Sequence, residues 1–524
     1  MTSRQALEQE VDILLVDLQQ MAALETSLLW LLCENLPLSA SPARLDLLRT
    51  LLEPNSDLGE LRLPRTGAEV WRAYYLESMT DAQTLNEGLV AALSAERPVA
   101  AVASTRPAAT YGQAVRGVLD GQVALLTHGS GGVLLLEARD MPKRKPTHPV
   151  LETVVRGPHE AFVEDLTTNV SLLRRRLKDP RLTFEAHTVG RLTQTEVRLC
   201  YIQGLTNTRV VAEARRRLRA VSTDMVLDSA YIEESLMDDP YSIFPQLDFT
   251  ERPDIVTAGL CEGRFAILVD GSNAALVAPV TFWSFMQAAD DYYQFFYAGT
   301  FLRLLRLAFA LIALLMPAFY IAVTTFHQQM IPTALLLTLM RAHVGVPLPA
   351  VVEAFIMEIS LEILREAALH LPDKLGTGLS VVGGLIIGQA VVAAGLVTWP
   401  VVAIVAITAI ANFAIPRWGL ALAVRLLRFS EMVAAAVFGL PGMLVATAMI
   451  MIHMVSLRSF GLPYLSPLAP MDIPGLGDAF VRSPHWSPRP RPRLLEPLWR
   501  MRTRPGHRPQ PPAASGTRGR DPSP

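Results

Sequence analysis

The sequence predicts a soluble N-terminal region of mixed α+β/α/β structure, built from two related modules, followed by an all-α polytopic membrane domain. Of the 524 residues, 51% are hydrophobic and 18% are charged. This is too apolar for a soluble protein and too charged for one that lies wholly in a membrane. A strand, helix and hairpin pattern occurs twice before residue 295, and the long apolar stretches begin near residue 300. These observations place the division between the two parts close to residue 296.

Residues 1–65 are predicted to form a helical extension, because Val11, Leu14, Leu18 and Met21 recur at helical spacing. The extension lacks a basic segment followed by an uninterrupted apolar run, so no cleaved signal peptide is predicted. The net charge of −2 gives no reason to expect nucleic acid as a partner. The three cysteines are widely spaced without a CxxC pair, so neither a metal site nor a disulfide framework is expected.

An internal duplication divides the soluble region. Residues 118–136 (VLDGQVALLTHGSGGVLLL) match residues 260–278 (LCEGRFAILVDGSNAALVA), with glycines at the same places in both. The upstream strands also agree, since AEVWRAYY at 68–75 aligns with TEVRLCYI at 195–202. A repeated pattern indicates a repeated structural unit. We therefore expect one α/β module at 66–155 and a second at 156–295.

The membrane domain is predicted at 296–470, with four to six helices. Residues 304–325 are apolar except for Arg306 and are long enough to cross a hydrocarbon core of about 30 Å. Further spans are expected near 378–397, 400–415 and 429–455. Residues 471–524 are rich in arginine and proline and are expected to be a disordered tail.

An acidic helix is predicted at 350–369 inside this domain. It carries Glu353, Glu358, Glu362 and Glu366, the last three at i, i+4 and i+8, so they form one slowly drifting stripe. An ionised carboxylate in hydrocarbon is costly and faces a water-filled path or a partner. Rings of such carboxylates in an oligomer would select cations. Two alternatives are a helix lying at the membrane interface with its glutamates in water and a contact with another subunit.

A GxxxG pattern at Gly384 and Gly388 follows the acidic helix. Small residues at this spacing let membrane helices approach closely, although glycine is common in spans in general. The face that also carries Gln389 is the second candidate for a pore lining. The chain has no GxxxxGK[ST], HExxH or GxSxG motif, so we expect neither an enzyme nor a cofactor.

The orientation follows from basic residues, which favour the cytoplasmic side of a membrane. Arg303 and Arg306 precede the first span and place residues 1–300 on that side. Arg417, Arg425 and Arg428 favour the same side, as does the arginine-rich tail. A single span between Arg428 and the tail cannot satisfy both, so the number and parity of the spans stay open.

Several ordered motifs carry a resemblance to a known family. They are RGPHEAFVEDLTTNVSLLRRRLKDPRL at 156–182, PYSIFPQLDFTERPDIV at 240–256, VVEAFIMEISLEILREA at 351–367 and SFGLPYLSPLAP at 459–470. With them the chain resembles the A subunits of spore germination receptors, the GerA type. The resemblance extends over about residues 69–470.

The resemblance implies a multi-pass protein of the spore inner membrane, with its N-terminal domain on the spore-core side. It implies a permease-like B subunit that binds the germinant and a lipoprotein C subunit as partners. It also implies a homo-oligomer that acts as a nutrient-gated ion channel. The alternatives are a stage V sporulation paralogue of the same family, and a secondary transporter or scaffold that assists ion release. A transporter usually shows symmetry inside its membrane part, whereas here the repeat lies in the soluble part.

Overall fold

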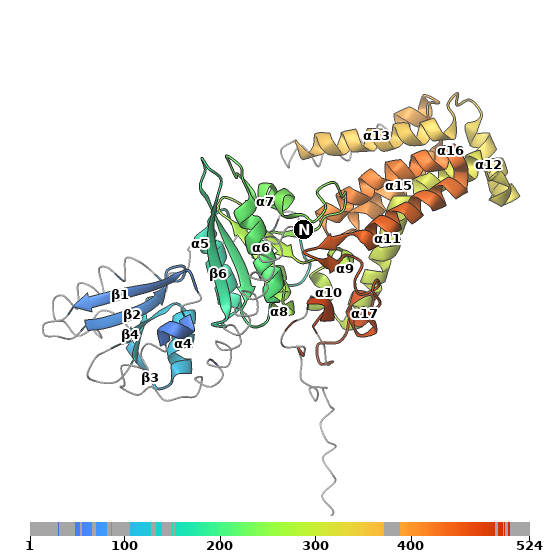
Figure 1. The fold of residues 1–524 in the computed structure, drawn as a ribbon. Coiled ribbons are helices and arrows are strands. Elements are labelled where there is room, and N and C mark those ends of the chain that lie inside the picture. Colours follow the sequence, from blue (N-terminus) through green and yellow to red (C-terminus); the bar gives the residue numbers. More distant parts are fainter. Residues whose placement is uncertain are drawn as a thin grey trace, which may run out of the picture.

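The computed structural model describes residues 48–52, 55–64, 70–80, 105–126, 133–138, 152–370, 388–487 and 491–495, and the single residues 30, 85, 149, 497, 501 and 502. Two antiparallel five-stranded sheets are followed by a helical part. The sheets lie on one side of the molecule and the long helices extend away from them on the other (Figure 1).

The first sheet has the strand order β1-β2-β4-β5-β3. Its elements are β1 (Leu58–Pro64), β2 (Val70–Leu76), β3 (Thr105–Ala108), α4 (Tyr111–Leu119), β4 (Gln122–Leu126) and β5 (Val133–Glu137). The Thr110 side chain caps α4 by accepting a hydrogen bond from the backbone N–H of Gln113. Because β1 pairs with β2 along its whole length, the predicted boundary at residue 65 is wrong. The segment 1–65 is not entirely a helical extension, since it supplies an edge strand.

The second sheet has the order β6-β7-β9-β10-β8, with its strands joined in the same sequence as in the first sheet. Its elements are α5 (Leu166–Arg176), β6 (Leu182–Val189), β7 (Thr195–Ile202), α6 (Thr208–Ala220), α7 (Ser229–Leu236), β8 (Asp248–Thr250), α8 (Pro253–Glu262), β9 (Phe265–Val269) and β10 (Ala275–Ala278). The duplicated segment 260–278 contains the end of α8, Gly263 in the left-handed conformation (φ 96°), and then β9 and β10.

A buried ion pair joins the two sheets. Arg174 of α5 donates from Nε to Asp57, just before β1, over 2.9 Å, and from Nη2 to Asn55 over 3.0 Å. Burial alone would raise the pKa of the Asp57 carboxyl, but Arg174 outweighs it and holds the pKa below its usual value. The backbone amide of Ser56 also donates to the Phe184 carbonyl.

The helical part begins after two short helices, α9 (Phe282–Met286) and α10 (Asp290–Tyr293). It contains α11 (Phe296–Thr325), the 3-10 helix η3 (Gln328–Met330), α12 (Thr333–His343), α13 (Ala350–Leu369), α15 (Trp399–Phe413) and α16 (Trp418–Ser456). Among the described residues, α11 and α16 are long and apolar enough to cross a membrane, and α15 is a shorter apolar helix. We call the end of this part near the sheets the sheet end, and the opposite end the far end.

The helix α16 is a helical hairpin. Gly439 has φ 61° and ψ −145°, which is not helical. Thr447, beyond this point, donates a hydrogen bond of 2.9 Å to Glu431, before it, so the legs 418–438 and 440–456 lie side by side. The predicted span at 429–455 includes Gly439 and is therefore wrong as one continuous crossing. Instead, the first leg leaves the sheet end and the second returns to it.

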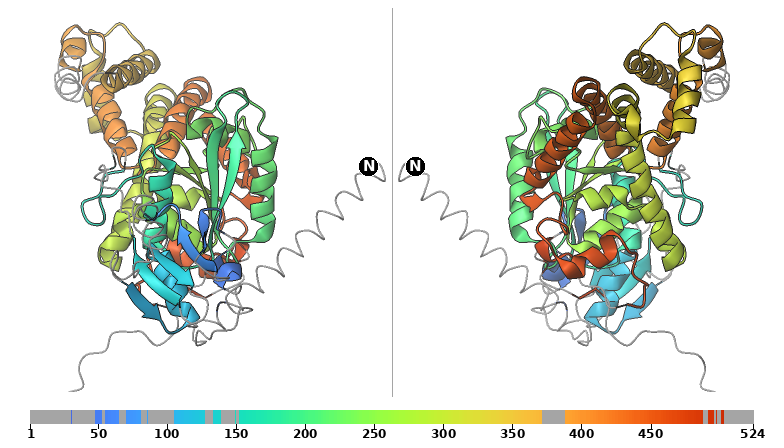
Figure 2. Two further views of the ribbon diagram at one scale, coloured as in Figure 1. Left: turned by 90° about the vertical axis from the view of Figure 1, so that its left-hand side faces the viewer. Right: turned by 90° about the vertical axis from the view of Figure 1, so that its right-hand side faces the viewer.

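The segment after α16 packs against the sheet end. It contains β11 (Arg458–Ser459), β12 (Leu462–Pro463), α17 (Ile473–Ala479) and η4 (Arg493–Leu495). Phe282 donates its amide to the Tyr464 carbonyl over 2.8 Å, and the Trp283 ring lies 4.5 Å from that of Phe480. The prediction that the whole of 471–524 is a disordered tail is therefore wrong for its first residues. The two views of Figure 2 show this segment in red beside the second sheet.

Candidate functional site: the acidic helix and its partners

The acidic helix α13 has the predicted bounds and runs alongside α15 in the same direction. Near its start, Glu353 contacts Thr398, which precedes α15. Towards its end, Arg365 lies 5.4 Å from the ring of Phe413, the last residue of α15. Both helices thus run from the far end to the sheet end, and Figure 1 shows α13 pointing back towards the sheets.

Glu353 caps the N-terminus of α15. Its Oε2 accepts from the Thr398 amide over 2.7 Å, and Nε2 of His343 lies 3.6 Å from its Oε1. The glutamate is fully buried. A carboxylate at a helix N-terminus is stabilised by the unpaired amides and the helix dipole, so the negative charge of Glu353 has a partner within the chain.

Glu358 forms a buried ion pair with Arg428 in the first leg of α16. Nη1 of Arg428 donates to Oε2 of Glu358 over 2.6 Å, and its Nε donates to the Ala313 carbonyl of α11 over 2.8 Å. Both charged side chains are almost completely inaccessible to solvent. This arginine therefore joins three helices, α11, α13 and α16, at one point.

Glu362 and Glu366 lie nearer the surface. Glu362 pairs with Arg365, one turn on, over 3.0 Å and with Arg425 of α16 over 3.5 Å. Glu366 is 70% exposed in its side chain and pairs with His370 over 3.0 Å. The predicted stripe thus drifts along the helix from a buried position at Glu358 to an open one at Glu366.

The face of α13 opposite the buried Glu353 and Glu358 is exposed, and apart from Glu366 it is mainly apolar. It carries Val352, Ile356, Ile359 and Ile363, which recur at helical spacing. This orientation differs from that of a helix at a membrane interface with all its glutamates in water, because Glu353 and Glu358 point into the protein. Hydrocarbon or another protein surface suits the exposed face.

The second predicted face is described only in part. Gly384 lies outside the described residues. Gly388 is half-buried, Gln389 is exposed, and a Cβ added to Gly388 would lie 3.8 Å from Val402 of α15. That separation is an ordinary contact, so Gly388 does not itself mark a close approach of two helices.

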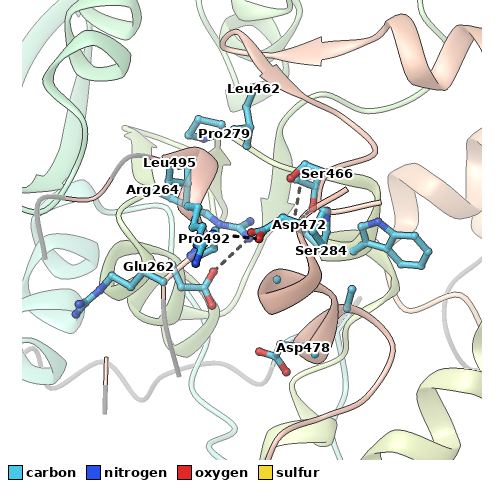
Figure 3. Close-up of a pocket in the computed structure, with 18 of the residues that line it drawn as sticks. Glu262, Arg264, Pro279, Ser284, Leu462, Ser466, Asp472, Asp478, Pro492 and Leu495 are labelled. Atoms are coloured by element: carbon cyan, nitrogen blue, oxygen red, sulfur yellow. Dashed lines mark hydrogen bonds and ion pairs between the residues drawn. The ribbon is translucent and has the colours of Figure 1, made fainter. Parts of the chain in front are cut away.

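A cavity of about 170 Å³ lies at the sheet end, between the turn after α8 and the C-terminal segment (Figure 3). Several charged side chains of the lining pair with one another. Glu262 lies 3.2 Å from Arg264 and 3.3 Å from Arg502, and Asp472 lies 4.0 Å from Arg493. The pair of Glu262 with Arg502, and the 2.8 Å hydrogen bond that Arg491 Nε donates to the Cys261 carbonyl, join the C-terminal segment to the end of α8. No His, Cys, Asp and Glu cluster suited to a metal occurs among the residues that the structure describes.

Sequence reasoning missed the basic partners of the acidic helix. Arg425 and Arg428, which the sequence presents as orientation signals, lie inside the first leg of α16 and form ion pairs with Glu362 and Glu358 of α13. A signal was present, because an arginine within an otherwise apolar stretch calls for a carboxylate or carbonyl partner. Thr398 gave no such signal, since its contribution is a backbone amide.

Comparison with known proteins places the chain in a family. The family model for the Bacillus/Clostridium GerA spore germination protein matches residues 46–494. Spore germination protein KA of Bacillus subtilis (strain 168) is 42% identical over 401 residues, which cover 76% of this chain and 74% of that protein. Spore germination protein GerLA of Bacillus cereus is 37% identical over 423 residues, covering 81% and 86% respectively.

Two further matches are a membrane protein and a solved structure. The uncharacterized membrane protein YfkQ of Bacillus subtilis (strain 168) is 43% identical over 375 residues, covering 72% of this chain and 73% of that protein. The crystal structure of the N-terminal domain of the A subunit of the Bacillus megaterium spore germinant receptor GerK3 matches 47% of this chain and 98% of its own, with 26% identity and a TM-score of 0.36. Because the family model covers most of the sequence and these relatives align over most of their lengths, the chain belongs to the GerA family of spore germination proteins.

Proposed function

We propose that the chain is the A subunit of a spore germinant receptor, embedded in the spore inner membrane, where it transmits the germination signal and conducts cations as a homo-oligomer. The family membership carries the receptor role. The permease-like B subunit and the lipoprotein C subunit implied by the resemblance are the proposed partners. The two sheets, with their common strand order, are proposed to be duplicated modules that receive the signal.

The helical part is proposed to cross the membrane six times. At 1.5 Å per residue, α11 is about 45 Å long and the first leg of α16 about 31 Å, enough for a hydrocarbon core of about 30 Å. The helix α13 and the second leg of α16 return to the sheet end, as α15 does. Since α13 ends at the sheet end and α15 begins at the far end, the chain changes ends between these two helices, where the sequence predicts a span near 378–397 that lies partly outside the described residues. An even number of crossings puts the C-terminal segment on the same side as the sheets.

This arrangement removes the conflict between the basic segments. Arg303 and Arg306 pair with the buried Asp291 at the sheet end, at 3.4 and 2.7 Å. Arg417 pairs there with Asp248 over 3.2 Å and also with Glu152. The arginine-rich C-terminal segment returns to the same end. Because basic residues favour the cytoplasmic side, the sheets are proposed to face the spore core.

The ion path is proposed to follow the acidic stripe of α13. Glu362 and Glu366 are the accessible members, and in a ring of subunits they would form stacked acidic rings that attract cations. Glu353 and Glu358 are held by Thr398 and Arg428, so they are proposed to join the path only when α13 moves. The Glu358–Arg428 pair would then hold α13 in the closed state of the channel.

The test is potassium release from germinating spores of a strain that lacks the chain and carries variants of it. Glu362→Gln and Glu366→Gln preserve side-chain shape and remove charge, so each should slow release at unchanged protein abundance. Lysine at these positions should slow it further, because like charges repel at close range. Glu234→Gln, an exposed carboxylate on α7, is the matched control. Normal release in all four variants would refute the proposed path.

A further inference from the structure

A loop of the sheet region reaches the end of the helical part. Residues 239–245, between α7 and β8, extend to the second leg of α16, where Ser242 Oγ lies 2.9 Å from Nε2 of His453. The same loop reaches the start of α16, since a Cβ added to Gly419 would lie 3.2 Å from Pro245. The loop therefore lies at the sheet end of the helices.

Side chains alternate along this loop. Phe244 is buried, and its ring stacks 6.1 Å from that of His453. Tyr241 is 95% exposed and Ile243 is 47% exposed. One side of the loop therefore packs against α16, and the other side exposes an aromatic and an aliphatic side chain on the protein surface.

Exposed apolar side chains also occur at this end of the helical part. Ile452 and Val455, on either side of His453 in α16, are 68% and 54% exposed. Other exposed aromatic residues mark the same end, at the beginning of α11, the end of α15 and the beginning of α16: Phe295, Tyr297, Phe301, Phe413 and Trp418. Tyrosine and tryptophan side chains suit the boundary between hydrocarbon and water, because each has an apolar body and a polar group.

We infer that loop 239–245 is a membrane anchor, with Tyr241 and Ile243 inserted into the headgroup region of a phospholipid bilayer. The inference rests on the proposed membrane location of the helices. The anchor fixes the second sheet at the membrane surface beside α16, at a point independent of the covalent connection through α9 and α10. A movement of this sheet would then be transmitted through the loop to the second leg of α16, which contains His453.

The test uses the full chain in phospholipid vesicles. Cys33, Cys200 and Cys261 are replaced by alanine, and single cysteines are introduced as Tyr241→Cys or Ile243→Cys and labelled with an environment-sensitive fluorophore. Quenching by lipids that carry a spin label near the headgroup is then measured. Leu311→Cys, on the exposed middle of α11, is the positive control. Ala109→Cys, exposed between β3 and α4, is the negative control.

An interfacial anchor lies within about 5–10 Å of the headgroup boundary. Both loop positions should therefore be quenched strongly by headgroup-labelled lipid, with blue-shifted emission, whereas Ala109 should not be quenched. Leu311 should be quenched best by lipid labelled deep in the acyl chain. If Leu311 is quenched and both loop positions behave like Ala109, the anchor is refuted and the membrane location stands. If none of the positions is quenched, the membrane location itself fails, and the anchor with it.

Discussion

Replacing Arg428 with methionine should strongly destabilise the helical part. The change removes the 2.6 Å bond to Glu358 and the 2.8 Å bond to the Ala313 carbonyl, and it leaves the Glu358 carboxylate buried without its cation. A hydrogen bond to a charged group contributes roughly 1.5–3 kcal/mol, and breaking a buried ion pair typically costs about 3–5 kcal/mol. We expect Arg428→Met to lower the free energy of unfolding, measured in detergent, by about 3–5 kcal/mol.

Two further variants separate the ion pair from other effects. Glu366→Gln removes one partner of an exposed pair, which contributes at most about 1 kcal/mol, so it should scarcely change the unfolding transition. Glu358→Leu combined with Arg428→Met removes both charges and should recover much of the lost stability. The reasoning is refuted if Arg428→Met unfolds like Glu366→Gln, or if the double variant is no more stable than Arg428→Met alone.

Three other predictions follow from backbone conformation, titration and domain boundaries. Gly439→Ala should be much more destabilising than Gly271→Ala: both positions have positive φ, but the new Cβ would lie 2.8 Å from His327 at the first and meet nothing within 4 Å at the second; thermal unfolding of the two variants checks this. Burial raises the pKa of Asp248 to about 6, against the opposing effect of Arg417. The folded state therefore binds this proton more tightly than the unfolded state, and the stability of the protein should rise as the pH falls from 7 towards 4. Thermal unfolding measured across this pH range should show the rise in the unchanged chain, and the contribution of Asp248 to it should be absent in Asp248→Asn. A fragment of residues 46–295 should unfold cooperatively in denaturant, whereas one that begins at residue 69 lacks β1 and Asp57 and should be markedly less stable or fail to unfold cooperatively.

Local patterns predicted the parts of the fold that depend on neighbouring residues. The helix at 350–369 has its predicted bounds because its apolar positions recur locally and Pro349 directly precedes it. The hairpins at 118–136 and 260–278 were found because glycine punctuates two apolar runs. The edge strands β3 and β8 were missed, since each pairs with a strand from which a helix and another strand separate it in the sequence. No local pattern specifies such a pairing.

The partners of the acidic helix could not be predicted for a related reason. Glu358 and Arg428 are 70 residues apart, and their pairing depends on how α13 packs against the first leg of α16. The reversal at Gly439 was not predicted either, since the sequence indicated a single span at 429–455. Burial of the pair is thus a consequence of tertiary structure, although the need for a partner could be inferred from the charge of each residue.

The central claim is that the chain crosses the membrane an even number of times, so that the C-terminal segment lies on the same side as the sheets. Labelling of exposed positions from one side of the membrane tests this claim directly. Single cysteines replace Tyr231 on α7, Val344 after α12 and Met501 in the C-terminal segment, all exposed, in the same cysteine-free chain. A membrane-impermeant thiol reagent is applied to intact and permeabilised protoplasts. We predict that position 344 is labelled in intact protoplasts and that positions 231 and 501 are labelled only after permeabilisation. Labelling of position 501 together with 344 in intact protoplasts would contradict the account.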